Sequence, residues 1–293
     1  MFNKTINTMQ HKEASTAVML PFTKMQGLGN DYVYMEELEA PLQNAPELAR
    51  KISRRHFGVG SDGLVLIGHS EIADFRMRIF NADGSEAEMC GNGARCLARY
   101  AYENGIAGEN MVFETVAGPV EAWRRSEREY KIKLNSPGIF TPDVKACVGD
   151  KTYDCTYVEL GSPGIPHGVV NLPNFRELPE EEFKEIGKAL RYHEVFPKGA
   201  NINFYDIAPD GEIYLSTYER GVEDFTLACG TGSGSTALTL QHKKEVEDSL
   251  IKLNVPGGIL SVEIVQNGDD VDLYLIGDTN IVAKGTLTDE DIF

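Results

Sequence analysis

The chain has 293 residues, of which 42% are hydrophobic, and a formal net charge of −17. This length and hydrophobic content are enough for two domains with substantial cores. Nucleic acids and anionic membranes repel an acidic protein, and no apolar stretch approaches a membrane span, so neither is expected as a partner. Residues 1–20 hold only a short apolar run, which predicts a disordered extension rather than a secretion signal, and therefore a cytoplasmic protein.

Strand-like and helix-like stretches alternate along the first half of the chain. A turn at 27–31 leads into a strand at 32–36, and a short helix follows Pro46. A helix that begins after Cys90 stops at Gly105, because glycine commonly ends helices. Further strands are predicted at 64–67, 75–80, 112–115, 120–123 and 130–134.

The second half repeats this order of elements. One helix is expected from Pro179 and another after Cys229. Strands are predicted at 157–160, 169–172, 202–207, 212–218, 250–255, 260–265, 271–275 and 281–287. The simplest account is a duplicated unit with a domain boundary near 137–138. The last predicted strand, 281–287, is expected to return to the sheet of the first domain. The expected domains are therefore 21–137 with 280–293, and 138–279.

Two matched cysteine segments are the strongest sign of that duplication. Cys90-Gly91-Asn92-Gly93 and Cys229-Gly230-Thr231-Gly232 each place a cysteine before a glycine-rich turn into a helix, 139 residues apart. Small or apolar residues then recur with the spacing of one buried helical stripe. A helix N-terminus presents unpaired N–H groups and partial positive charge, which lower the pKa of a thiol and bind carboxylates. Two such helices facing one cavity would place a thiol on each side of an anionic substrate.

No motif for a cofactor or a metal accompanies these cysteines. The chain has five cysteines and no C-x-x-C spacing, which favours free thiols in a reduced compartment over disulfides or zinc. Neither a complete dinucleotide-binding loop nor a Walker loop is present. We therefore expect the chemistry to be done by side chains alone, without a cofactor and without a metal.

Other polar residues are candidates for holding a small anionic molecule. Arg220, in Glu219-Arg220-Gly221, is suited to clamp a carboxylate, with a surface salt bridge as the competing interpretation. His167 is either an acid–base group or a hydrogen-bonded orienting group. Four asparagines lie in turn-like settings where ordinary turn formation is the alternative: Asn30, Asn81, Asn92 and Asn201.

Taken together, these segments resemble the diaminopimelate epimerase family. The seventeen residues from Phe80 to Cys96, FNADGSEAEMCGNGARC, are similar to its first signature, and Ala228-Cys229-Gly230-Thr231-Gly232 is similar to its second. The resemblance spans roughly residues 21–290 and includes KMQGLGND at 24–31, GVGSDG at 58–63 and NINF at 201–204.

This resemblance implies an α+β fold of two pseudo-symmetric domains, each a curved, mostly antiparallel sheet or barrel around a central helix. It also implies a cofactor-independent isomerase with an active site between the domains, most simply one converting LL-2,6-diaminopimelate to the meso form for lysine and peptidoglycan precursor synthesis. Cys90 and Cys229 would be the catalytic pair, supported by His167 and Glu219. The substrate would be held by Asn30, Asn81, Gly91, Asn92, Asn201, Glu219, Arg220, Gly230 and Thr231.

Two departures from the family pattern bear on the substrate. Ile165 stands where the family has an asparagine, and the stretch 221–226 is one residue longer. Both changes fall on the side expected to contact the distal end of the substrate. A racemase of another amino acid, such as histidine or another polar one, is therefore the alternative within the class.

Two other classes of function remain as alternatives. A thiol redox enzyme would use a disulfide between the two distant cysteines, which we expect only as an inactivating side reaction. A non-catalytic binding relative would not require both cysteines at helix N-termini. The sequence leaves the oligomeric state open, with a homodimer as one state.

Overall fold

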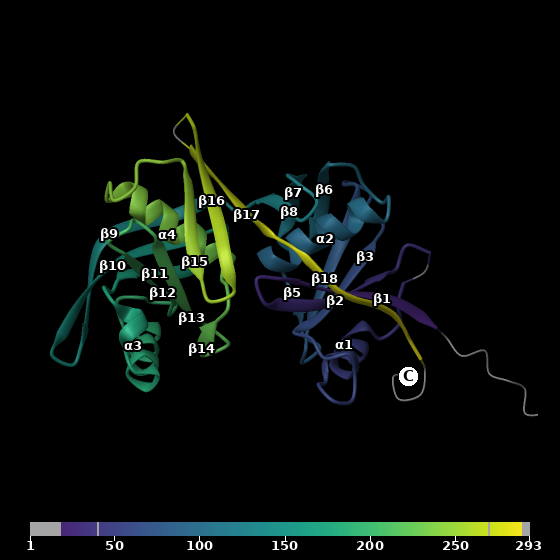
Figure 1. The fold of residues 1–293 in the computed structure, drawn as a ribbon, viewed down its shortest axis with the longest axis horizontal. Coiled ribbons are helices and arrows are strands. Elements are labelled where there is room, and N and C mark those ends of the chain that lie inside the picture. Colours follow the sequence, from purple (N-terminus) through teal and green to yellow (C-terminus); the bar gives the residue numbers. More distant parts are fainter. Residues whose placement is uncertain (1–18, 40, 269, 289–293) are drawn as a thin grey trace, which may run out of the picture.

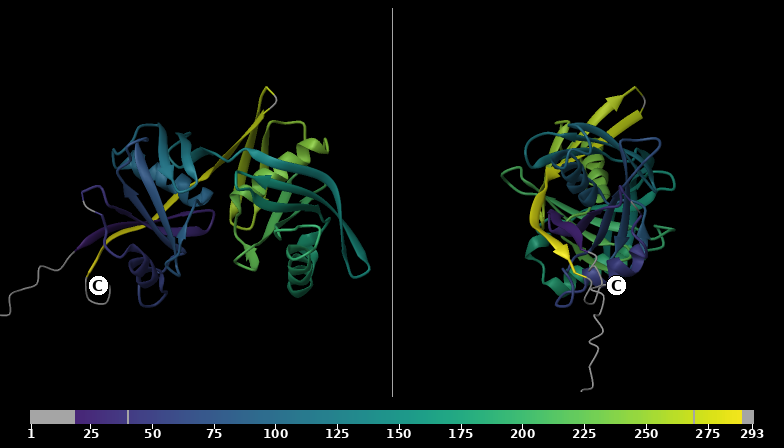
Figure 2. Two further views of the ribbon diagram at one scale, coloured as in Figure 1. Left: turned by 180° about the vertical axis from the view of Figure 1, so that it is seen from behind. Right: turned by 90° about the vertical axis from the view of Figure 1, so that its right-hand side faces the viewer.

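The computed structural model describes residues 19–39, 41–268 and 270–288 and shows two lobes side by side (Figure 1). Each lobe is a curved sheet wrapped around one helix, α2 in one lobe and α4 in the other. The same two lobes, joined by crossing segments, are seen from behind in Figure 2. The expectation of two similar α+β halves, each with a central helix, is confirmed.

Four helices and one 3-10 turn lie among eighteen described strands. The helices are α1 (Ala45–Ser53), α2 (Gly91–Glu103), α3 (Glu180–Arg191) and α4 (Gly230–His242), with the 3-10 turn at Phe175–Glu177. The first eight strands are β1 (Leu20–Gly27), β2 (Asn30–Glu36), β3 (Gly63–Gly68), β4 (Phe75–Asn81), β5 (Glu86–Ala87), β6 (Asn110–Thr115), β7 (Gly118–Arg124) and β8 (Glu129–Lys133). The remaining strands are β9 (Pro137–Val148), β10 (Lys151–Leu160), β11 (Ile165–Asn171), β12 (Asn201–Ile207), β13 (Ile213–Glu219), β14 (Asp224–Thr226), β15 (Leu250–Val255), β16 (Gly258–Asn267), β17 (Asp270–Asp278) and β18 (Asn280–Leu287).

The two lobes repeat the same strand pairings in the same order. In the first lobe β2 pairs parallel with β3, β4 pairs antiparallel with β3 and parallel with β6, and β6, β7 and β8 form an antiparallel meander. In the second lobe β11 and β12, β12 and β13, β13 and β15, and the meander β15–β17 repeat each of these relations. The repeat extends to the helices, so the duplication inferred from the cysteine segments involves the whole unit.

The chain passes between the two lobes twice, once after β8 and once after β17. β8 and β17 pair antiparallel with each other, with Ile132 opposite Leu275, and so join the two sheets. After β8 the chain enters the second lobe, where β9 pairs with β10, and after β17 it returns to the first, where β18 pairs with β1. Our predicted domain limits at 137/138 and 279/280 stay a prediction. The expected extension at 1–20 falls mostly outside the described residues, as do 289–293, whereas Leu20 already begins β1.

The two central helices are buried more completely than a single apolar stripe would require. Every residue from Asn92 to Ala101 of α2 and from Gly232 to Leu240 of α4 is buried. The small side chains of α4 let the sheet approach from all sides. Three of its buried hydroxyls are satisfied within the helix, since Ser233, Thr236 and Thr239 each donate to the carbonyl four residues earlier. Burial of both helices fixes the positions of their N-termini.

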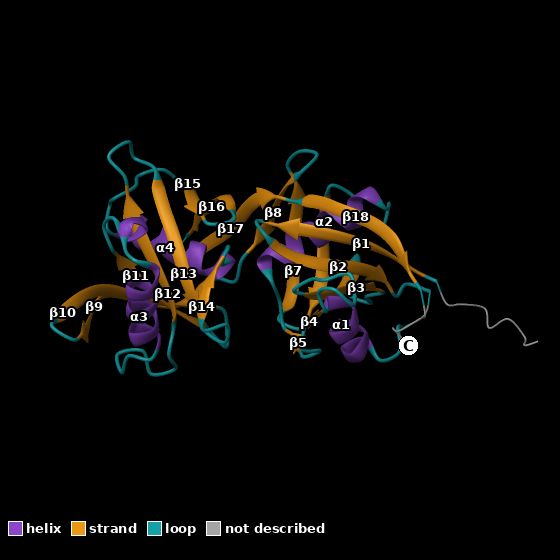
Figure 3. Ribbon diagram, turned by 60° about the horizontal axis from the view of Figure 1, so that its bottom comes forward, coloured by secondary structure: helices purple, strands orange, loops and turns teal. Residues whose placement is uncertain are grey.

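The other two helices cover the outer face of each sheet. Figure 3 shows α1 and α3 in equivalent places, one on each lobe. Leu48 and Ile52 of α1 are buried in a cluster with strands β2 and β3. Ile186 and Leu190 of α3 are buried against the second sheet. These helices close the apolar faces that do not contact α2 or α4.

Two long strands were missed in the sequence analysis. β1 pairs with β2 and β18, and the twelve-residue strand β9 pairs with β10. Half of β9 is exposed, and Gly138, Pro142 and Asp143 interrupt its hydrophobic residues, so the period-2 signal that marks a half-buried strand is weak. The signal of β1 is weak because, of its three buried positions Thr23, Met25 and Gly27, Met25 alone has a large apolar side chain. Both strands are fixed by pairing rather than by local propensity.

Leu275 gives a direct test of the junction between the lobes. This β17 side chain is fully buried, and its Cδ2 atom would lie 3.1 Å from a Cβ atom at Gly91 and 2.8 Å from one at Gly230. We expect Leu275→Ala to lower the free energy of unfolding by about 2–5 kcal/mol, as for other buried leucines. Leu250→Ala is the matched control, because Leu250 is 47% exposed and should change stability little. Denaturant unfolding measures both, and equal stabilities of the two variants would contradict the assignment.

Candidate active site

A single cavity of about 1040 Å³ brings the predicted residues together between the lobes. Eleven of the twelve predicted site residues line it: Asn30, Asn81, Cys90, Gly91, Asn92, Asn201, Glu219, Arg220, Cys229, Gly230 and Thr231. His167 is the exception. Residues of both halves of the chain contribute, so neither half forms the cavity alone. A cavity of this size suits a small molecule with a few polar groups.

The two cysteines occupy equivalent positions at the walls of this cavity. Cys90 is the N-cap residue of α2 and Cys229 is the N-cap residue of α4, both with extended backbone angles. The helices begin very close together, since a Cβ atom at Gly230 would lie 3.9 Å from the Cα atom of Gly91. Two sets of unpaired helix N–H groups therefore face the same space, an arrangement suited to an anion.

Burial, rather than the helix N-terminus, dominates the acidity of both thiols. Burial raises the pKa of Cys90, and hydrogen bonds from the N–H groups of Gly93 and Asn92 offset this only in part. Burial also raises the pKa of Cys229 to about 12, again against a hydrogen bond from Gly232. The expected lowering of the thiol pKa by the helix N–H groups is therefore present but does not set the net direction. The N–H groups act in the expected direction, but desolvation of the thiolate is larger.

A carboxylate near both cysteines acts in the same direction as burial. Glu219 is largely buried, burial raises its pKa, and its Oε2 atom accepts a hydrogen bond of 2.8 Å from Thr226. When ionised, Glu219 raises the pKa of Cys90 and of Cys229 by charge repulsion. Glu219 is thus placed to disfavour ionisation of both thiols at once.

The thiol of Cys90 is held by side chains from the first lobe. Its Sγ atom donates to Oδ1 of Asn30 at 3.2 Å, and Nδ2 of Asn30 donates to Asp62 at 2.6 Å. A hydrogen bond with Tyr32 lowers the pKa of Cys90. These contacts fix the rotamer of the thiol on its side of the cavity. On the other side, Cys229 lies 3.8 Å from the hydroxyl of Thr231.

The guanidinium-bearing wall of the cavity is assembled from β12 and the end of β13. The backbone N–H of Arg220 donates to Oδ1 of Asn201 at 2.8 Å, and its side chain donates to the carbonyl of Lys198 at 3.3 Å. Nδ2 of Asn201 in turn donates to the carbonyl of Pro166. Asn201 and Arg220, which are nineteen residues apart, are therefore fixed relative to each other.

His167 lies behind the cavity rather than on its wall. It is fully buried, and its Nδ1 atom is 3.2 Å from Nδ2 of Asn203. Burial, together with the charge of Arg220, lowers the pKa of His167 to about 3, so the ring is neutral near pH 7. Asn203 packs under the first turn of α4, where a Cβ atom at Gly232 would collide with its Oδ1 atom. His167 thus reaches the site through Asn203.

Three residues that contact the predicted site were not found from the sequence. Tyr32 contacts the Cys90 thiol, Asp62 holds Asn30, and Thr226 holds Glu219. Asp62 lies in the GVGSDG segment, so its position beside a signature was the available signal. Within the described ranges, no group of three or more His, Cys, Asp or Glu side chains is arranged to hold a metal ion.

Solved structures of epimerases and their relatives share this fold. A phenazine biosynthesis protein of the PhzF family from Bacillus anthracis is 14% identical, with a TM-score of 0.70 over 92% of this chain and 99% of that chain. A hydroxyproline epimerase from Agrobacterium vitis is 15% identical, with a TM-score of 0.65 over 92% and 91%. The fold is therefore one used by enzymes that invert amino-acid stereocentres, among others.

The sequence comparisons identify the family more closely. The family model described as diaminopimelate epimerase matches residues 22–136 and 160–282. A diaminopimelate epimerase of Phocaeicola vulgatus is 36% identical over 92% of this chain and 99% of its own length, and one of Caldanaerobacter subterraneus is 38% identical over 91% and 98%. This chain belongs to the diaminopimelate epimerase family and is an isomerase. No helix in the described part of the chain is long and apolar enough to cross a membrane.

Glu219 provides a test of the site's electrostatics that is independent of turnover. Neutralising it in Glu219→Gln removes a repulsion that raises the pKa of both thiols, so more thiolate is present at a given pH. We expect Cys90 and Cys229 to react faster with iodoacetamide between pH 8 and 10 in this variant, as mapped by peptide mass spectrometry. Exposed Cys147 serves as the internal reference.

The matched control for this measurement is Glu88→Gln. Glu88 also lines the cavity, but its side chain is exposed and its charge is screened by solvent. Its removal should leave both alkylation rates close to those of the wild-type protein. Slower alkylation in Glu219→Gln, or an equal increase in both variants, would contradict the role assigned to Glu219.

Proposed function

We propose that Cys90 and Cys229 invert the configuration of an amino-acid α-carbon, and that the reaction is LL-2,6-diaminopimelate to meso-2,6-diaminopimelate. The observation that carries this proposal is that the two cysteines, from opposite lobes, cap two helices and line one cavity. Membership of the diaminopimelate epimerase family supports the substrate. In this reaction one thiolate removes the α-hydrogen while the opposite thiol delivers a proton to the other face.

The first turns of α2 and α4 are suited to hold the α-carboxylate. The N–H groups of Gly91, Asn92, Gly230 and Thr231 begin the two helices at the cavity wall. Negative charge builds on the carboxylate as the α-proton leaves, and donors fixed in place before the reaction stabilise that charge. Helix dipoles add to this effect because both positive ends point to the same group.

The site favours a single negative charge shared by the two thiols. Burial opposes ionisation of either cysteine, each thiolate would raise the pKa of the other, and Glu219 adds to the repulsion. The reactive form therefore holds one thiolate and one thiol. Both the fully protonated and the fully ionised pair are inactive, so the pH profile of kcat/KM is expected to be bell-shaped.

The other polar side chains of the cavity are proposed to hold the rest of the substrate. Asn30, Asn81, Asn201, Glu219 and Arg220 provide amide, carboxylate and guanidinium groups on its wall. Arg220 is the natural partner for a second carboxylate. His167 is proposed to support catalysis from behind, as a neutral ring that orients Asn203.

A racemase of another amino acid is the second candidate, and one observation favours it. Ile165 lines the cavity, with Val222 and Phe225 also on its wall, so part of the surface is apolar. An apolar wall next to Arg220 would accept a single amino acid that lacks a distal ammonium group. Turnover over a panel of amino acids, including histidine, separates the two candidates.

We also propose a cytoplasmic location and a homodimer. All five cysteines are free, which fits a reduced compartment.

Among the described strands β18 pairs with β1 alone, and Val282 on it is 55% exposed, so this edge is open to a second copy. Sedimentation of the purified protein tests the assembly.

The proposed chemistry requires both thiols for inversion. Incubation with LL-diaminopimelate in heavy water should give meso product that carries α-deuterium. NMR measures this deuterium. Cys90→Ala and Cys229→Ala should each lower kcat for inversion by about 10³-fold or more, because each removes one of two acid–base groups. Cys147→Ala is the matched control, since that thiol is exposed and does not line the cavity, and should retain full activity. Wild-type protein that inverts no amino acid, or a folded Cys90→Ala variant that inverts normally, would contradict the proposal.

A further inference from the structure

Arg95 is a cation buried inside the first lobe, one turn into α2. Its side chain is fully buried, and within the described residues no carboxylate oxygen lies within 4.0 Å of its nitrogens. The guanidinium packs against two glycines, Gly277 of β17 and Gly27 of β1. A Cβ atom added at Gly277 would lie 3.3 Å from the Nε atom of Arg95, and one added at Gly27 would lie 3.5 Å from its Nη2 atom. Both strands are thus shaped to admit this side chain.

The position of this cation is unfavourable for stability alone. A buried cation with no carboxylate in direct contact is costly, although the charge of Asp278 acts on Arg95 from further away. A cation near a helix N-terminus adds repulsion from the helix dipole. Buried groups of this kind usually compensate their cost by a contact that a neutral side chain cannot make. The contacts of Arg95 therefore show what it does.

Those contacts lead from Arg95 to both cysteine helices. Its Nη2 atom donates to Oδ1 of Asn92 at 2.8 Å, and its Nη1 atom donates to the carbonyl of Gly91 at 3.4 Å. Since Oδ1 of Asn92 faces the guanidinium, Nδ2 faces away, and it donates to the carbonyl of Ala228 at 3.3 Å. Ala228 is the residue before Cys229. Arg95 thereby fixes the side-chain amide of Asn92, which donates to the backbone just before α4.

We propose that Arg95 is a positioning residue for the inversion reaction, which acts by fixing the Asn92 amide and through it the spacing of the two cysteine-bearing helix N-termini. This inference rests on the proposed function. The fork of the guanidinium is essential to it, because two nitrogens must reach the Gly91 carbonyl and the Asn92 side chain together. Misplacement of the reacting groups by about 1 Å can lower the rate about 100-fold.

The test is a double-mutant cycle with kcat/KM for the inversion as the readout. Arg95→Met, which keeps length and removes the cation, should lower kcat/KM about 100-fold. Arg95→Lys keeps the charge but loses the fork, and should lower it about tenfold. Since Arg95 acts through Asn92, the variant combining Arg95→Met with Asn92→Ala should be no more than about threefold worse than Asn92→Ala alone. A catalytic role independent of Asn92 would instead make the two effects multiply, and a role in stability only would leave kcat/KM of the folded variant unchanged.

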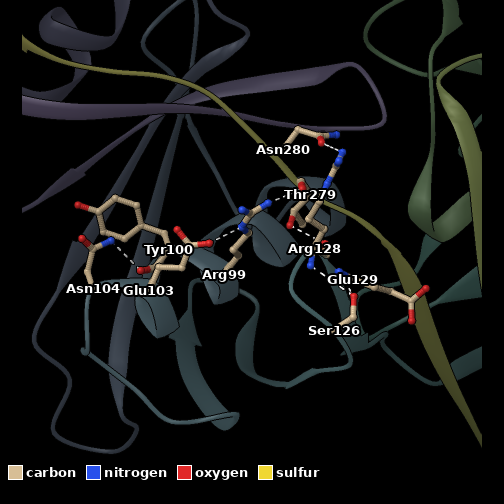
Figure 4. Close-up of polar contacts among 9 residues, drawn as sticks. All are labelled: Arg99, Tyr100, Glu103, Asn104, Ser126, Arg128, Glu129, Thr279 and Asn280. Carbon is tan, nitrogen blue, oxygen red and sulfur yellow. Dashed lines mark hydrogen bonds and ion pairs between the residues drawn. The ribbon is translucent and has the colours of Figure 1, made fainter.

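Arg99→Lys is the matched control, because Arg99 is a buried arginine one turn further along α2. Figure 4 shows its guanidinium directed toward Glu103 and Thr279, and it donates to the Thr279 carbonyl at 2.7 Å, away from the cavity lining. We expect a lower melting temperature for this variant with kcat/KM within about twofold of wild type. Circular dichroism and thermal unfolding establish that each variant is folded.

The outcomes of this cycle separate the inference from the proposed function. A wild-type protein that inverts no amino acid overturns both. An active wild-type protein overturns the inference alone if folded Arg95→Lys retains full kcat/KM, if the Arg95 and Asn92 effects multiply, or if Arg99→Lys loses as much activity as Arg95→Lys. Should Arg95→Met not fold, the cycle is completed with Arg95→Lys.

Discussion

The constraint on which the structure depends is the close approach of two helix N-termini between the lobes. β8 and β17 pair where the two halves of the chain meet, and Leu275 of β17 lies under both Gly91 and Gly230. A side chain at either glycine would have to displace it. The exchange of β9 and β18 holds the lobes around this junction. The cavity is therefore a product of the duplication, and each half supplies one thiol to it.

The same enclosure has two opposing consequences for the chemistry. It strengthens the helix N–H groups as donors to a carboxylate, because their dipoles act in a medium that excludes water. It also raises the pKa of Cys90 and of Cys229, so thiolate is scarce. A thiolate of high pKa is, however, a stronger base, and the α-hydrogen of an amino acid is a very weak acid. The site therefore holds little thiolate at neutral pH, but the thiolate that forms is a stronger base.

Much of this site was predictable because its residues sit in short signatures. The two Cys-Gly segments place their residues at helix starts through glycine and helix periodicity alone, and local signals of this kind do not depend on the fold. Contacts between distant segments were not predictable. Tyr32 of β2 contacts the Cys90 thiol, Asp62 just before β3 holds Asn30, and Thr226 of β14 reaches Glu219. Sequence also could not show that desolvation outweighs the helix dipole, or that His167 lies behind the cavity, since burial depends on the whole packed structure.

The central claim is that two thiols act on opposite faces of one carbon, and the early-time fate of the α-hydrogen tests it most directly. Protiated LL-diaminopimelate is mixed with the enzyme in heavy water and quenched before equilibrium is approached. The account predicts that the meso product carries deuterium at the inverted centre while recovered LL substrate remains protiated, because the base that removes the hydrogen is not the acid that returns one. Recovered substrate that gains deuterium as fast as the product would show a single base serving both faces, and would contradict the account.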